Sequence, residues 1–162
     1  MANSIKTQGT RLYFVDQTGS APVVRRMECP SGVQGLGGAA DQVDDTCLEE
    51  LDASSTPGLR RPGQITVPFI LKDDQVAGQS ALETMYEGDT PTIGWCVALS
   101  NGTGEPTLDS ADEMVAPTDR DGWLFNGYVA DLNFDIATNE VVRGTLLIQR
   151  VGGRTRFYKA LV

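Results

Sequence analysis

The sequence predicts a mainly β protein, a sandwich or barrel of about seven or eight strands with one flanking α-helix and a long interaction loop. Three observations support this fold class. Short apolar runs alternate with a period of two, as in half-buried strands. Most of the eighteen glycines and eight prolines lie between these runs, where they mark turns. Only one stretch, near the middle of the chain, has helical spacing.

The first predicted elements are two strands joined by a turn. Residues 10–15 are aromatic and β-branched, and residues 22–29 read as their hairpin partner. A third strand is expected at residues 64–71, where one face carries the alternating residues Ile65, Val67, Phe69 and Leu71. Pro68 cannot donate to a strand ladder, so we place this strand at a sheet edge or beside a bulge.

The single helix is expected at residues 75–87, with Asp74 as its cap and Gly88 at its end. Its apolar residues fall three and four positions apart and form one stripe that can pack across a sheet. The stripe consists of Ala77, Ala81, Leu82, Met85 and Tyr86.

The clearest strand follows the helix, because large and small residues alternate strictly along it. Its expected core face is Ile93, Trp95, Val97 and Leu99. Residues 123–136 then predict a long strand with Gly127 as a plausible bulge site. Residues 141–151 predict its partner, and Gly152 with Gly153 predicts a turn into a last strand at residues 155–158.

Two stretches lack an apolar period. Residues 31–63 form the longer one, which is first rich in glycine and then acidic, and residues 101–121 form the other. Long connections within a compact domain are usually functional or disordered. The acidic run at residues 41–52 fits a solvated loop, and it also fits an extended arm or a surface that faces DNA. Arg60 and Arg61 are either solvated loop charges or partners for carboxylates of a neighbouring subunit. The candidate contact residues of the longer stretch are Asp41, Asp44, Asp45, Glu49, Glu50, Asp52, Leu59, Arg60 and Arg61.

Length and composition indicate one folded domain over residues 1–162. The start of the chain lacks the apolar stretch of a signal peptide, and no run is long enough to span a bilayer, so we expect no membrane insertion. Cys29, Cys47 and Cys96 are an odd count without CxxC spacing, which favours reduced thiols in a cytoplasmic assembly environment.

Charge argues against a nucleic-acid-binding function. The net charge is −9, and no basic run is longer than a pair of arginines, whereas DNA-binding domains cluster Lys and Arg to neutralise phosphates. Any passage of DNA over this protein would therefore be non-adhesive.

Catalysis and metal binding are also disfavoured. The chain has no histidine, which removes the commonest general base and the commonest zinc ligand. No carboxylate lies beside a Ser, Cys or Lys in a nucleophile motif. Residues 119–122 (Asp-Arg-Asp-Gly) resemble part of a calcium loop, but Trp123 follows and the later ligands are missing, so we interpret them as a turn. We expect no enzyme activity, cofactor or metal.

The order of these features resembles the major tail tube proteins of long-tailed, non-contractile bacteriophages over about residues 11–158. The most specific part is residues 62–69 (Pro-Gly-Gln-Ile-Thr-Val-Pro-Phe), followed by a helix and a Trp95-containing strand that ends in Ser100-Asn101-Gly102.

The resemblance implies a structural subunit that assembles with itself into hexameric rings, stacked into a tube through which DNA is ejected. It implies partners in the tape-measure, tail-tip or initiator, and tail terminator proteins, and a location in the virion tail after assembly in the bacterial cytoplasm. The long loop of such proteins bridges neighbouring subunits or rings, and here it corresponds to residues 40–62. An acidic lumen would repel phosphates and let DNA slide.

Three alternatives remain at this point. The chain could be the tube subunit of a contractile tail, a type VI secretion system or a gene-transfer particle. It could be a β-sandwich binding module for carbohydrate or a cell surface, although Trp95 and Trp123 both lie in strand patterns that favour core positions. An enzyme comes last.

Overall fold

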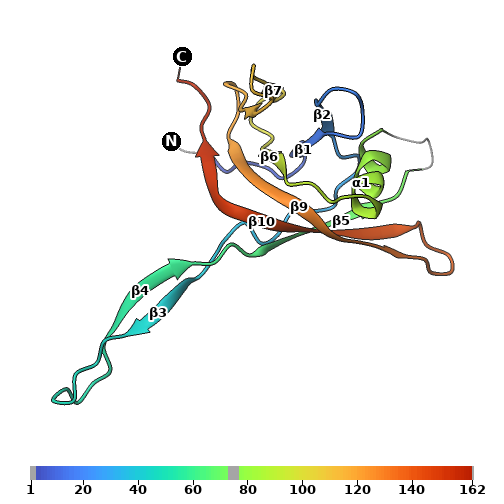
Figure 1. The fold of residues 1–162 in the computed structure, drawn as a ribbon. Coiled ribbons are helices and arrows are strands. Elements are labelled where there is room, and N and C mark those ends of the chain that lie inside the picture. Colours follow the sequence, from blue (N-terminus) through green and yellow to red (C-terminus); the bar gives the residue numbers. More distant parts are fainter. Residues whose placement is uncertain (1–2, 73–76, 162) are drawn as a thin grey trace.

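A computed structural model describes residues 3–72 and 77–161, and in this part the chain forms ten strands and one helix (Figure 1). The elements are β1 (Arg11–Asp16), β2 (Val23–Arg26), β3 (Ala40–Asp44), β4 (Ser55–Arg60), β5 (Gln64–Ile70), α1 (Ala77–Glu87), β6 (Ile93–Ala98), β7 (Thr107–Leu108), β8 (Met114–Val115), β9 (Gly122–Asp135) and β10 (Arg143–Phe157). The predicted fold class, mainly β with one helix, is confirmed.

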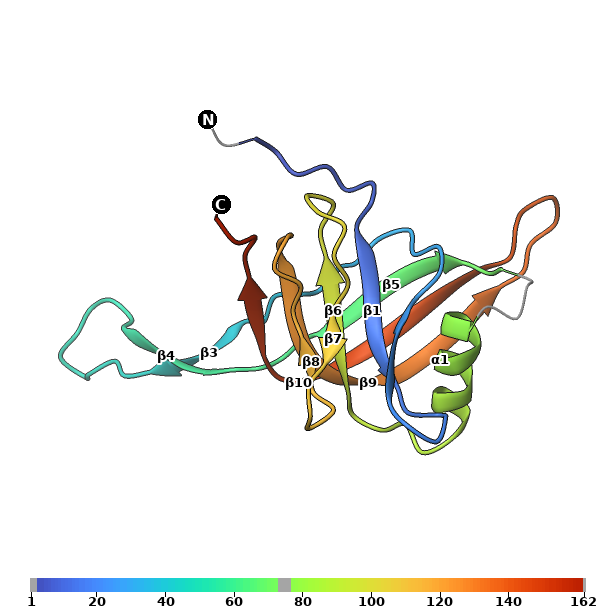
Figure 2. The same cartoon turned by 90° about the horizontal axis from the view of Figure 1, so that it is seen from above.

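Six strands form one antiparallel sheet in the order β2-β1-β6-β9-β10-β5, and this sheet is strongly curled (Figure 2). The prediction that the Pro68 strand lies at a sheet edge is confirmed, because β5 is the last strand in this order. Pro68 pairs with Thr145 of β10. Proline has no backbone N–H to donate, and an edge strand tolerates it because it pairs with a neighbouring strand on one side only.

The chain that follows β2 crosses from one edge of the sheet to the other. Its beginning still bonds to β1, and then Ser31 N donates to Pro68 O at 2.7 Å and Gln34 N to Thr66 O at 3.0 Å, both on β5. One segment therefore bridges the two edge strands and closes the curled sheet into a barrel-like shape. This closure satisfies backbone groups that an open edge would leave unpaired.

The core fills the inside of the curl. Ile65, Val67, Phe69, Ile93, Trp95 and Val97 are all buried. The indole of Trp95 is fully buried, and its Nε1 donates to the carbonyl of Gly127 at 3.1 Å, as a buried tryptophan requires. Leu71 and Leu99 were predicted on the same faces but are not core residues. Each lies one residue beyond its strand, where the chain leaves the sheet; Leu71 is 38% exposed and Leu99 is half-buried.

A smaller apolar cluster lies on the outside of the sheet. Tyr13, Cys96 and Ala98 are buried there beneath Met114 of β8 and Leu124 of β9. The β7–β8 ladder lies within residues 101–121, which the sequence predicted to be irregular. It covers this part of the sheet, so both faces of β6 are buried.

Helix α1 packs against the sheet through Ala81, Leu82 and Met85, which are buried. Tyr86, predicted in the same stripe, is 37% exposed. The proposed cap Asp74 and the predicted helix start at residue 75 lie outside the described residues, as does the side chain of Ala77.

The N-terminus of α1 is capped by a residue distant in sequence. The carboxylate of Glu28 accepts hydrogen bonds from Gly78 N at 3.2 Å and Gln79 N at 2.9 Å. A carboxylate at this end satisfies free N–H groups and complements the helix dipole. Glu28 therefore links α1 to the end of the β1–β2 hairpin.

Two predictions about the long C-terminal strands are wrong. The bulge lies at Ala130, which has no partner in the β9–β10 register, and Gly127 is paired with Arg150. Gly127 is needed instead because a Cβ there would lie 2.7 Å from Gln149 O. Gly152 and Gly153 form no turn between strands, since β10 continues through them with a shift in register against β9.

Candidate functional site

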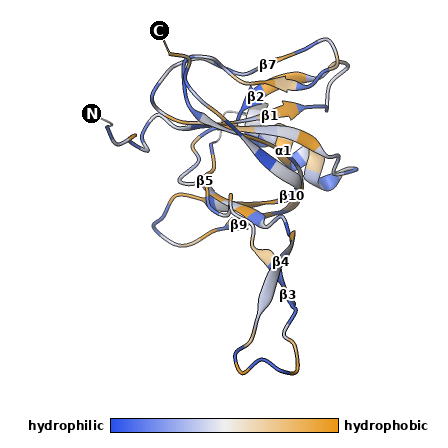
Figure 3. Cartoon of the chain, turned by 90° about the vertical axis from the view of Figure 1, so that its left-hand side faces the viewer, coloured by the Kyte–Doolittle hydropathy of each residue, from blue (hydrophilic) through white to orange (hydrophobic). Residues whose placement is uncertain are grey.

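Residues 31–63 were predicted to lack regular structure, but β3 and β4 pair within this stretch as an antiparallel hairpin. The hairpin projects away from the curled sheet, and its tip lies far from the rest of the chain (Figure 1, Figure 3). The sequence pattern missed it because both strands are exposed and carry no apolar alternation. Its ladder is held by backbone and side-chain hydrogen bonds instead.

Several of the predicted contact residues form hydrogen bonds inside the hairpin, and Asp44 and Asp45 are two of them. Asp45 accepts hydrogen bonds from the hydroxyls of Thr56 and Ser54, and these bonds hold the pKa of Asp45 below its ordinary value. Asp44 accepts from the hydroxyl and backbone N–H of Thr46, which likewise lowers the pKa of Asp44. Both carboxylates therefore shape the entry to the tip.

At the base of the hairpin, Arg61 Nε donates to both carboxylate oxygens of Asp41, at 2.9 and 3.1 Å. Because the Arg61 side chain is 81% exposed, the pair contributes little to stability and mainly orients the two side chains. Arg60 is exposed beside it. Arg61, predicted as a partner for a neighbouring subunit, is thus paired within its own chain.

The hairpin also exposes large apolar side chains. Leu48 and Leu51 at the tip are fully exposed, and Leu59 on β4 is 83% exposed. The remaining predicted residues, Glu49, Glu50 and Asp52, surround the two tip leucines in sequence and are exposed. Two fully exposed leucines three residues apart on a projecting tip are typical of a contact surface.

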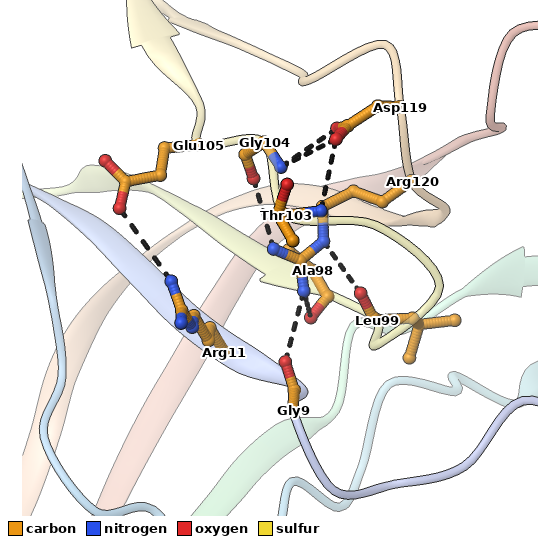
Figure 4. Close-up of polar contacts among 9 residues, drawn as sticks. All are labelled: Gly9, Arg11, Ala98, Leu99, Thr103, Gly104, Glu105, Asp119 and Arg120. Atoms are coloured by element: carbon orange, nitrogen blue, oxygen red, sulfur yellow. Dashed lines mark hydrogen bonds and ion pairs between the residues drawn. The ribbon is translucent and has the colours of Figure 1, made fainter.

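A second constellation, which the sequence did not reveal, surrounds Arg120 (Figure 4). This side chain is 1% exposed and donates hydrogen bonds to four backbone carbonyls. The acceptors are Leu99 at 2.7 Å, Ala98 at 3.0 Å, Gly104 at 3.1 Å and Gly9 at 3.2 Å. No local motif signals this role, because the acceptors are main-chain atoms of distant segments.

The carboxylates on either side of Arg120 are also occupied. Asp119 accepts from the backbone N–H groups of Thr103 and Gly104, which keep the pKa of Asp119 below its ordinary value. Asp121 accepts from Lys159 N at 2.6 Å. The segment thus joins the 100–105 turn to the C-terminal end of the chain.

A third feature is the second half of β10. Past Val151 this strand bonds to β9 on one side, and none of the other described strands pairs with its other edge. Arg154 and Arg156 lie here; Arg154 Nη1 donates to Leu36 O at 2.6 Å, and the Arg156 guanidinium lies 4.5 Å from the ring centroid of Trp123. This end of the strand is therefore open and basic.

Among residues 3–72 and 77–161, no group of three or more Cys, Asp or Glu is arranged to hold a metal ion. In the same residues, no helix has the length and apolar character needed to cross a membrane.

Comparison with known proteins decides the family. Residues 3–160 match the family described as phage tail tube, TTP, lambda-like. The chain belongs to this family. The tail tube protein is also 35% identical to "Structural protein 3" of Pseudomonas phage PAJU2 over 154 residues, which are 93% of this chain and 92% of that protein.

Solved structures share the fold of this tail tube protein at low sequence identity. The SPP1 tail tube protein matches with a TM-score of 0.64 and 13% identity, over 96% of this chain and 80% of that one. A chain of the anti-feeding prophage baseplate, determined with 6-fold symmetry, matches with a TM-score of 0.66 and 11% identity, over 99% of this chain and 100% of that one.

The protein is therefore a structural subunit of a phage tail tube and part of the virion, and it assembles with itself into a tube. It is not an enzyme, because its family is a structural one. The family also decides against the binding-module alternative.

Proposed function

We propose that this subunit builds the tube of a non-contractile tail as stacked hexameric rings, and that DNA passes through the tube during ejection. The lambda-like family and the six-fold assembly of the anti-feeding prophage neighbour support this ring symmetry. The observation that carries the proposal is the projecting β3–β4 hairpin, whose tip leucines no part of the described chain covers. Exposure of these leucines to water is unfavourable, and a neighbouring subunit that buried them would remove this cost.

Residues 40–62 form the arm that bridges neighbouring subunits or rings. Asp44, Asp45 and the Arg61–Asp41 pair serve the hairpin itself, since their polar atoms already bond within it. Glu50 also bonds within the tip, where its carboxylate accepts from Cys47 N at 3.2 Å. Glu49 and Asp52 at the tip, together with Leu59 and Arg60 on β4, therefore remain for contacts between subunits.

The open edge of β10, at residues 151–157, pairs with a strand of the neighbouring subunit in the ring. A strand edge that lacks a partner offers a regular row of donors and acceptors to another chain. The pairing of this segment with β9 is short and shifts in register at Gly152 and Gly153. The edge is therefore neither long nor flat, which limits non-specific aggregation.

Part of the net charge of −9 lines the lumen. Asp131 and Asp135 are on the same outward-facing side of β9, and neither has an ion pair among the described residues. Carboxylates on the inner wall would repel DNA phosphates and prevent adhesion during passage. A tube reconstruction with a basic inner wall would overturn this assignment.

The tube ends at other proteins. A tape-measure protein sets its length, a tail-tip or initiator complex starts it, and a terminator protein closes it, with assembly in the bacterial cytoplasm.

Negative-stain electron microscopy of the concentrated, purified chain, together with light scattering, tests the proposal. Hollow tubes or rings with six-fold class averages are expected; monomers that persist even with the tail-tip complex would overturn it. A sheath around the native tube would overturn the non-contractile assignment.

A further inference from the structure

A hollow with a volume of about 690 Å³ lies at one mouth of the barrel. It is bounded by residues 7–12, the bridging segment 30–36 and the ends of β6 and β9. Its apolar lining continues the core and consists of Leu12, Val33, Leu36, Val97, Leu99 and Trp123. The hydroxyl of Thr10 is buried in the same wall with no hydrogen-bond partner among the described residues.

We propose that the hairpin tip of one subunit inserts Leu48 and Leu51 into this hollow in a second copy of the chain. The inference rests on the proposed self-assembly and names the receiving surface. The tip carries two fully exposed leucines, and the hollow offers a concave apolar surface that can bury them.

Charge complementarity selects the same pairing. Three arginines border the hollow. Arg11 lines it but is paired with Glu105 of its own chain at 3.9 Å. Arg154 donates to the carbonyl of the lining residue Leu36, Arg156 stacks over the lining residue Trp123, and neither has an ion-pair partner among the described residues. The tip leucines are flanked by Glu49, Glu50 and Asp52. Opposite charges around an apolar contact steer the encounter and fix its register.

The geometry requires a second molecule. The hairpin points away from the barrel, so its tip cannot reach the hollow of its own chain (Figure 1, Figure 2). Tip and hollow are different surfaces, so each subunit can give one contact and receive one. Such head-to-tail contacts propagate along an assembly, whereas a contact between identical surfaces stops at a dimer.

Cross-linking can place the tip directly, because Cys47 is exposed next to Leu48. Gln8 is exposed at the rim, so Gln8→Cys adds a second thiol beside the hollow. A short bismaleimide applied to assembled tubes of Gln8→Cys should yield covalent dimers and higher ladders in a denaturing gel. The matched control Gln8→Cys with Cys47→Ser should yield none. Tubes in which both variants give the same pattern would overturn the inference.

The energetic test uses substitutions on both surfaces. Leu48→Asp with Leu51→Asp should reduce tube yield at least tenfold, while Leu48→Met with Leu51→Met, which keeps the side chains apolar, should assemble normally. Glu49→Arg with Glu50→Arg should also reduce assembly, and Arg154→Glu with Arg156→Glu in the same chain should restore it. Circular dichroism of the monomers checks that the variants fold.

These experiments distinguish a failure of the proposed function from a failure of tip insertion alone. If the unmodified chain forms neither rings nor tubes with its tail-tip complex, the proposed function fails and this inference with it. If tubes form equally well from the Leu48→Asp, Leu51→Asp variant, the inference alone fails. It also fails if Cys47 in native particles cross-links only to a different virion protein.

Discussion

The guanidinium of Arg120 donates a hydrogen bond of 3.2 Å to the carbonyl of Gly9, which lies 111 residues earlier in the chain. The same side chain holds the end of β6 and the 100–105 turn through its other bonds. Residues 7–12 and Leu99 also line the apolar hollow. By bonding to Gly9 and Leu99, Arg120 therefore holds part of the proposed receiving surface in place.

Replacing Arg120 with Ala should lower the free energy of unfolding by ~3 kcal/mol or more, because several buried carbonyls would lose their partners at once. Arg120→Lys should recover only part of this loss, since an ammonium lacks the planar fork that reaches separate acceptors. Chemical denaturation measures both. The exposed Arg143→Ala is the control and should change stability by less than ~0.5 kcal/mol. Equal effects at both positions would contradict the assigned role.

Replacing Glu28 with Ala should cost ~1 kcal/mol, because the N-terminus of α1 loses the acceptor of two N–H groups. Glu83→Ala removes an exposed carboxylate from the same helix without removing a cap, and it should cost much less. Thermal and urea unfolding of the two variants compare them directly. A similar loss from both would show that the cap contributes nothing.

The environment of Asp16 predicts that the free energy of unfolding falls at acid pH. It is 3% exposed, and although burial raises its pKa, the hydrogen bonds from Thr18 and Arg25 outweigh this and lower the pKa overall. A depressed pKa gives stability that is present above the unfolded value of about 3.9 and lost as the pH falls through the folded value.

The stability advantage of the unmodified protein over Asp16→Asn should therefore be constant above about pH 5 and shrink steadily below about pH 4. Urea unfolding at a series of pH values measures it. An advantage that grew towards acid pH would mean that the pKa of Asp16 is raised.

Gly127→Ala should destabilise the protein by ~1–3 kcal/mol, because the added methyl would lie 2.7 Å from Gln149 O and 3.0 Å from the Ile148 side chain. Gly153→Ala is the matched control on the partner strand, where nothing lies within 4 Å of the added atom. Its effect should stay within ~0.5 kcal/mol. Denaturant midpoints for the two variants, measured side by side, check this difference.

The cysteines should differ sharply in reactivity. Burial raises the pKa of the Cys96 thiol to about 12, so almost no thiolate forms near pH 8, whereas Cys47 is exposed on the hairpin tip. Maleimide labelling followed by peptide mass spectrometry should modify Cys47 in the native monomer and Cys96 only after unfolding. Rapid native labelling of Cys96 would show that the outer apolar cluster opens. Protection of Cys47 in assembled tubes would agree with tip insertion.

Much of the fold was predictable from local pattern. The alternation around Trp95, the helical stripe at Ala81, Leu82 and Met85, and the missing N–H of Pro68 are properties of adjacent residues. Each acts over a few positions, where spacing along the chain fixes spacing in space. The absence of histidine and of a nucleophile motif likewise favours a structural role from the sequence alone.

The candidate surfaces depended on contacts between distant segments. The β3–β4 hairpin has no apolar period, because neither strand faces the core. The arginines around the hollow come from opposite ends of the chain, and nothing in their local sequence indicates that they meet. Residues 119–122 were predicted to be a turn, but their sequence did not indicate that Asp119 and Arg120 bond to main-chain groups of distant segments.

The sequence by itself determined which segments form the central strands and the helix, and where the sheet has an edge. Its net charge of −9 predicts that the protein does not bind nucleic acid tightly. Only the tertiary structure decided that Gly152 and Gly153 continue a strand, that the bulge lies at Ala130, and that Glu28 caps α1. A hydrophobic pattern records which face of an element is buried. Turns, bulges, caps and hollows depend on which other segment lies opposite, and that is established only when the chain packs.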